Sequence, residues 1–178
     1  MGHSKLLNEI ISEMGGSDFT LTRFIPREKV QYWIGSEDIE ILGAVYALIG
    51  DKRHYTRIQP ALSFKDYHTF IMHYYERCFK ENPKSEWANS RYSAGWDLVN
   101  WFIGLWNDPD VPRKALKELK DWLAKLYKDG NDDLRTCLVT ATLEHLFEKR
   151  KIAGFFKDWK EKPILKIAYS QAMGWQTK

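Results

Sequence analysis

The side chains best suited to metal binding or acid–base catalysis are the histidines and the carboxylates beside them. His68 and His73 stand five residues apart, whereas two zinc ligands on one helix face need the i, i+4 spacing of an HExxH motif. His145 lies in the stretch EHLFE, which lacks the ExxH spacing of di-iron helical bundles. The sequence therefore predicts no metal site and no cofactor.

Arg91 stands in an aromatic stretch, SEWANSRYSAGWDLVNWFIGLWND, which covers residues 85–108. A guanidinium keeps its charge, so a buried one needs a carboxylate, carbonyl oxygens or an aromatic face as its partner. The favoured interpretation is architectural, with Arg91 reaching solvent or stacking on a neighbouring Trp or Tyr. A buried ion pair with another helix is one alternative, and an anion-binding or catalytic arginine is the other.

A polar site inside a helical core is the main hypothesis for ligand binding or catalysis. Asp97 and Asn100 are three residues apart and share a helix face, while Glu144 and His145 lie on another predicted helix. The candidate ligand-binding set is Arg91, Asp97, Asn100, Glu144 and His145. Simpler interpretations are a solvated helix edge for Asp97 and Asn100, and a core position for His145.

Motifs for nucleophilic or phosphate chemistry are missing from the sequence. There is no GxSxG, no Gly-rich phosphate loop and no kinase motif set. Paired carboxylates such as Asp132 and Asp133 fall at predicted helix starts, where the helix dipole explains them. The sequence favours a non-catalytic protein over an enzyme, and no catalytic residue is assigned.

The basic end of the chain suggests a binding partner. Residues 149–178 hold eight Lys or Arg against Asp158 and Glu161, a net +6; the whole chain carries +3, so residues 1–148 carry −3. The candidate partner-binding residues are Lys149, Arg150, Lys151, Lys157, Trp159, Lys160 and Lys162. The interpretations are a solvated basic face, an acidic protein partner, or nucleic acid, which the modest total charge disfavours.

Apolar periodicity and Pro positions predict helices near 4–14, 26–34, 37–50, 64–81, 86–107, 112–128, 132–149 and 163–175. Ser63 with Asp66 resembles a capping box, and Asn131 precedes two aspartates. No run alternates well enough for a sheet. The class is therefore all-α, with seven or eight helices in antiparallel hairpins around a Trp-rich central helix, 86–107.

The chain has the size of one domain, which we place at 1–178, with a peripheral helix in 1–16 and a basic hairpin in 149–178. The longest uncharged apolar run, residues 41–50, is half of the ~20 residues that a membrane span needs. The first residues lack the apolar region of a secretory signal. We expect a cytoplasmic protein without a membrane partner, in which Cys78 and Cys137 are reduced core thiols.

Two stretches carry a family resemblance. LVNWFIGLWNDPDVPRKALKELKDWLAKLY and TATLEHLFEKRKIAGFFKDWKEKPILKIAYSQAMGW each suggest a helix, a charged turn and a second helix. They resemble the hairpins of HEAT-like repeat proteins, and LEHLFE to FFKDW is similar to small all-helical bacterial immunity proteins. The resemblance covers the C-terminal half and implies a protein-interaction module that binds and neutralises a partner protein.

Overall fold

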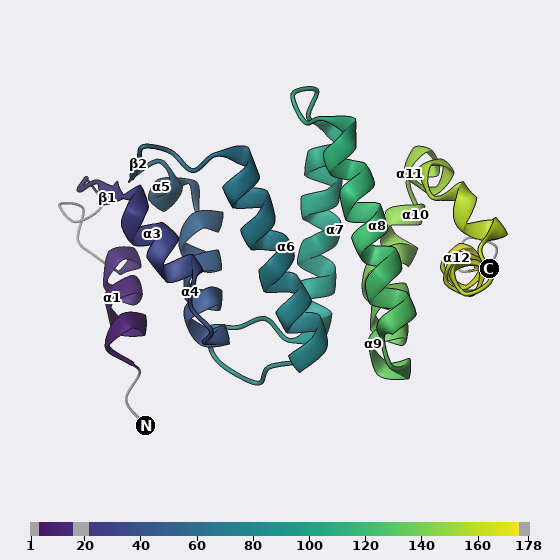
Figure 1. Ribbon diagram of the computed structural model, residues 1–178, viewed down its shortest axis with the longest axis horizontal. Coiled ribbons are helices and arrows are strands. Elements are labelled where there is room, and N and C mark those ends of the chain that lie inside the picture. Colours follow the sequence, from purple (N-terminus) through teal and green to yellow (C-terminus); the bar gives the residue numbers. More distant parts are fainter. Residues whose placement is uncertain (1–3, 16–21, 175–178) are drawn as a thin grey trace. The chain divides into compact units, whose positions relative to one another are not determined.

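A computed structural model describes residues 4–15 and 22–174 (Figure 1). It is built almost entirely of helices, which confirms the all-α class. One small parallel pairing of two residues a strand was not expected: β1 (Ile25–Pro26) pairs with β2 (Ile58–Gln59), with Ile25 opposite Ile58. No helix of the described residues is both long enough and apolar enough to cross a membrane.

The chain divides into two compact units. Unit 1 comprises Met1–Cys78 and Asn82–Ser90, and unit 2 comprises Phe79–Glu81 and Arg91–Lys178. The organisation as one domain stays a prediction. Residues 1–3 and 16 of the predicted N-terminal helix region, and 175–178 of the predicted hairpin, lie outside the described residues.

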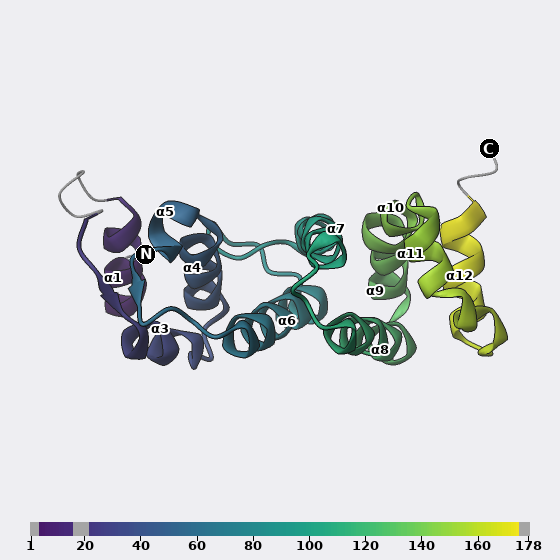
Figure 2. The same cartoon turned by 90° about the horizontal axis from the view of Figure 1, so that it is seen from above.

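Unit 1 is organised around a helix that is apolar on nearly all sides. Its helices are α1 (Lys5–Met14), α3 (Arg27–Ile34), α4 (Ile39–Gly50), α5 (Lys52–Tyr55) and α6 (Phe64–Glu81) as far as Cys78. The helix α4 lies between α1 and α6 in both views (Figures 1 and 2). This position explains why α4 is apolar on nearly all sides: its buried residues are Ile41, Leu42, Gly43, Ala44, Val45, Leu48 and Ile49.

Side-chain caps set the helix starts of unit 1. The Ser63 hydroxyl accepts a hydrogen bond from the Asp66 amide over 3.0 Å, and α6 begins at Phe64 as predicted. The start of α4 is two residues later than predicted, because Asp38 caps it by accepting a hydrogen bond from the Glu40 amide over 2.9 Å.

Unit 2 contains α7 (Arg91–Asn107), α8 (Arg113–Asp129), α9 (Asp132–Cys137), the π-helical turn η1 (Leu138–Leu143), α10 (Glu144–Phe147), α11 (Arg150–Phe155), the 3₁₀ helix η2 (Lys157–Glu161) and α12 (Leu165–Gly174). The rings of Phe102, Phe147, Phe156 and Trp159 are fully buried and form its aromatic core. The charged turn predicted before residue 163 is mostly helical, because it contains α11 and η2.

The predicted helix 132–149 is widened in its middle by η1. There the Thr142 hydroxyl donates to the Gly95 carbonyl over 3.1 Å, and a Cβ at Gly95 would lie 2.8 Å from the Ala141 Cβ. Because Gly95 has no side chain, α7 and η1 can approach closely at this level. Cys78 and Cys137 form no disulfide and are buried, as expected.

The start of the central helix was predicted five residues too early. In unit 1, residues 86–90 form no helix, because tertiary contacts take their backbone groups. The Asn89 amide donates to the Tyr74 hydroxyl over 2.9 Å, and the Tyr74 hydroxyl donates to Asn89 Oδ1. The Trp87 carbonyl lies so close to Gly43 that a Cβ there would be only 2.0 Å from its oxygen.

Candidate functional site

Arg91, the first residue of α7, binds main-chain carbonyls. Its Nε donates to the Phe79 carbonyl over 2.6 Å and its Nη2 to the Lys80 carbonyl over 3.3 Å, both in the last turn of α6. Carbonyls at a helix C-terminus lack intrahelical donors and carry partial negative charge, so they suit a guanidinium. These bonds give Arg91 an architectural role, but through main-chain carbonyls rather than through the predicted stacking on Trp or Tyr or exposure to solvent.

His145 lies against Trp96 of α7 at the surface of unit 2, with the two rings tilted by 32°. The ring centroids are 4.1 Å apart, and His145 Nδ1 lies 3.1 Å from Glu148 Oε1. Trp96 is half exposed, as is Tyr92 one helical turn earlier. His145 is therefore a surface-edge residue rather than a core histidine.

The remaining members of the predicted polar set are spread along two helices. Asp97 is partly exposed and Asn100 is exposed, both on α7, while Glu144 begins α10. The Glu144 Oε1 atom is buried without a hydrogen-bond partner among the described residues. Burial raises the pKa of this carboxyl, and the neighbouring His145 opposes the rise.

The structure thus brings Glu144 and His145 beside the turn of α7 that holds Trp96 and Asp97, but it does not bring Arg91 to them. Asp97 lies six positions after Arg91, which is about 9 Å along a helix. The Arg91 guanidinium is hydrogen-bonded to the end of α6. Among residues 4–15 and 22–174, no group of three His, Cys, Asp or Glu could hold a metal ion.

The predicted partner-binding residues fall into two groups. Six of them are exposed cations on or beside α11 and η2: Lys149, Arg150, Lys151, Lys157, Lys160 and Lys162. Trp159 differs, because it is 1% exposed and its ring packs edge-on against Phe156 with centroids 5.0 Å apart. It belongs to the core, so it holds η2 in place and presents no surface to a partner.

A buried lysine fixes this basic segment to α8. Lys120 donates to the Phe155 carbonyl over 2.7 Å, forms an ion pair with Asp158, and lies 4.8 Å from the centre of the Phe155 ring. Lys162 pairs with the same carboxylate over 2.8 Å. Burial alone would raise the pKa of Asp158, but hydrogen bonds from Lys120 and Lys162 hold it below its ordinary value.

Asp158 therefore compensates Lys120 and Lys162 and leaves other cations uncompensated. Lys149, Arg150, Lys151 and Lys157 join no ion pair within the described part of the chain. We call these four residues the α11 cations. Their charge faces solvent and is available to an acidic partner.

Two exposed isoleucines, Ile164 just before α12 and Ile167 in its first turn, accompany the basic segment. Ile164 is 43% and Ile167 50% exposed, and Ile167 lines a shallow hollow with Lys166, Ser170 and Gln171. Lys160 reaches the same helix, since its ammonium lies 5.1 Å from the centre of the Tyr169 ring. We did not predict from the sequence that Ile164 and Ile167 would form an exposed apolar pair. Their spacing of three residues on a predicted helix does indicate that they share one face.

Three comparisons with known proteins, against family models, curated proteins and solved structures, found no match to this chain.

Proposed function

We propose that the chain is a non-catalytic protein-interaction module whose C-terminal segment binds an acidic protein. The observation that carries the proposal is that the C-terminal segment exposes both apolar side chains, Ile164 and Ile167, and the α11 cations, which have no ion partner among the described residues. Interfaces combine apolar contact with complementary charge, which gives both affinity and selectivity.

We retain the cytoplasmic location expected from the sequence, and the immunity-type role that the resemblance implies. In that role the partner is a toxic enzyme, and binding silences it. The partner then presents carboxylates to the α11 cations and an apolar patch to α12. A nucleic-acid partner fits the structure less well, because exposed isoleucines contribute nothing to phosphate contacts.

The test is affinity capture from lysate of the source cell, with mass spectrometry of the bound proteins. We expect one stoichiometric protein that is lost when Lys149, Arg150 and Lys151 are changed to Glu. The matched control changes three exposed lysines of α8, Lys117, Lys125 and Lys128, to Glu. Equal loss in both variants, or retention on RNA or DNA with a steep dependence on salt, would contradict the proposal.

Once the partner is purified, its activity tests the immunity-type role. We expect titration with this chain to abolish that activity at a one-to-one ratio. The three-residue variant of α11 should leave the activity intact, whereas the α8 control variant should abolish it. A partner whose activity persists in the complex would contradict the immunity-type role while leaving the interaction itself established.

A further inference from the structure

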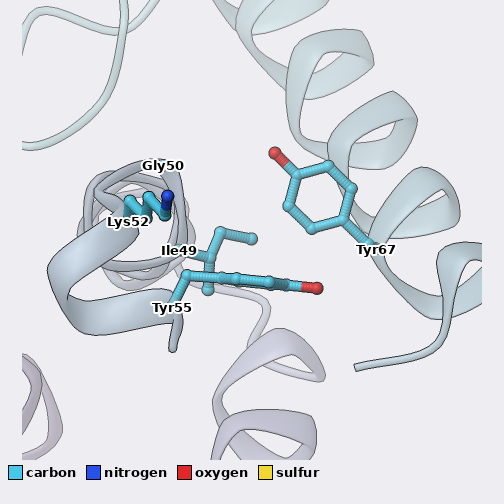
Figure 3. Close-up of a pocket in the computed structure, with 5 residues that line it drawn as sticks. All are labelled: Ile49, Gly50, Lys52, Tyr55 and Tyr67. Atoms are coloured by element: carbon cyan, nitrogen blue, oxygen red, sulfur yellow. The ribbon is translucent and has the colours of Figure 1, made fainter. Parts of the chain in front are cut away.

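A pocket lies wholly within unit 1. It has a volume of about 350 Å³ and is lined by Ile49, Gly50, Lys52, Tyr55 and Tyr67 (Figure 3). These residues come from the end of α4, from α5 and from α6. Pockets that bind small molecules begin at about 300 Å³, so a small organic molecule fits this one.

The walls of the pocket are aromatic and apolar. The rings of Tyr55 and Tyr67 meet edge to face, with centroids 5.9 Å apart and planes at 80°. Ile49 is 3% exposed and supplies an aliphatic wall. Gly50 leaves the space open, because a Cβ at this position would meet no atom within 4 Å. Such surfaces favour a flat ring over a flexible chain.

The charge at the pocket is positive and uncompensated. Next to it, Asp51 is occupied by Arg53, whose Nη2 lies 2.6 Å and whose Nε lies 3.1 Å from the carboxylate. Lys52 has no ion partner among the described residues. Figure 3 shows Lys52 on the α5 side of the pocket, and Tyr67 extending into the pocket from α6.

Tyr67 adds a hydrogen-bond donor to this charge. Burial raises the pKa of the Tyr67 hydroxyl, which therefore stays protonated at neutral pH. A ligand carboxylate can accept from a phenol and from an ammonium at once, and charge-assisted bonds of this kind are the stronger ones.

We propose that this pocket binds a small planar aromatic carboxylate, with its ring against Tyr55, Tyr67 and Ile49 and its carboxylate at Lys52. The site is independent of the proposed partner-binding surface and of the polar set predicted from the sequence.

The test uses 2-naphthoate and its neutral analogue 2-naphthylmethanol, followed by NMR titration of the full chain. A ligand of this size bound at ordinary efficiency has a Kd of about 1 mM. We expect shifts at the amides of Gly50 and Lys52, and an affinity for the alcohol about two- to fivefold weaker, as an exposed charge pair provides. Equal affinity for both compounds, or no binding of 2-naphthoate, overturns the proposal.

Two variants locate the site. Gly50→Leu fills the open space and should abolish binding, whereas Gly104→Leu, at another exposed helical glycine with open space around it, should leave binding unchanged. Lys52→Met, an exposed substitution that does not threaten folding, should make the affinities for acid and alcohol equal. If Gly50→Leu binds 2-naphthoate as the unmodified chain does, or if Lys52→Met still prefers the acid, the proposal is wrong.

Discussion

Arg57 and Glu13 form a buried ion pair 44 residues apart in the sequence. Arg57 Nη2 lies 2.7 Å from Glu13 Oε2, and the two side chains are 5% and 4% exposed. Arg57 also donates from Nη1 to the Glu13 carbonyl over 2.7 Å and from Nε to the Arg23 carbonyl over 2.9 Å. One guanidinium therefore ties the end of α1 to the segment before β2.

Removing one partner of this pair should destabilise unit 1 strongly. Glu13→Ala leaves a buried cation, and we expect the free energy of unfolding to fall by about 3–5 kcal/mol. The double variant Glu13→Leu with Arg57→Leu should lose less than Glu13→Ala, because no buried charge then remains. Urea unfolding followed by circular dichroism measures both, and a double variant less stable than the single one would contradict this account.

His54, which lies beside this pair, should make stability depend on pH. Its Nδ1 is 3.3 Å from Arg57 Nη1, and burial lowers the pKa of the imidazole from its ordinary 6.5, with Asp51 opposing and Arg57 adding to the effect. The unfolded chain then binds the proton more tightly. The loss of stability due to His54 is absent above pH 6.5. It sets in as the pH falls below 6.5 and grows toward the lower pKa of His54 in the folded chain.

NMR titration of the His54 ring and urea unfolding at several pH values check this prediction together. We expect the His54 signal to titrate below 6.5 and the loss of stability to follow it. A His54 ring that titrates above 6.5 would contradict the assigned burial effect.

Gly43 of α4 should tolerate no side chain. A Cβ there would lie 2.0 Å from the Trp87 carbonyl oxygen and 2.9 Å from the Ala88 Cα, both backbone atoms that move only with the segment. We expect Gly43→Ala to lower the free energy of unfolding by at least about 1–3 kcal/mol, the usual cost of overpacking. Gly104→Ala, with open space around it, should instead stabilise by about 0.5–1 kcal/mol.

The sequence predicted the elements whose signals are local. The start of α6 follows from Ser63 and Asp66, and that of α9 from Asn131. In α8, leucines recur every three or four residues and so predict one buried stripe, which the structure confirms for Leu116, Leu119, Leu123 and Leu126. Each of these signals is complete within one or two helical turns. Local pattern was enough because the cap and the stripe do not depend on distant residues.

Features that depend on distant residues were not predicted. The start of α7 is shifted by Gly43 and Tyr74, which lie on other helices. Lys120 falls outside the leucine stripe of α8, yet it is buried because Asp158 and the Phe155 carbonyl supply its partners. The pairing of Arg57 with Glu13 likewise has no trace in spacing or composition. Tertiary contacts decide such positions, and one sequence does not reveal them.

Arg91 should matter for stability and not for binding. Its two bonds to the α6 carbonyls are charge-assisted but partly exposed, so we expect Arg91→Ala to cost about 1–2 kcal/mol in the free energy of unfolding. Capture of the protein partner should be unchanged under conditions where the variant is folded. Loss of partner binding by folded Arg91→Ala would instead favour a site around Arg91.

Ile164 and Ile167, at the start of α12, should behave in the opposite way to Arg91: we expect them to matter for partner binding and not for stability. Because Ile164 and Ile167 are about half exposed, changing both to Ser should alter the free energy of unfolding by no more than about 0.5 kcal/mol for each. In the complex each isoleucine would be buried. Truncation of a buried interface residue that carries affinity costs more than about 1 kcal/mol, or about fivefold in Kd, and we expect a loss of this size here. The matched control is Tyr32→Ser in unit 1, where the side chain is 72% exposed. Isothermal titration with the captured partner separates the two outcomes: weakened binding by the α12 variant alone supports the proposed surface, and unchanged binding by that variant places the interface elsewhere.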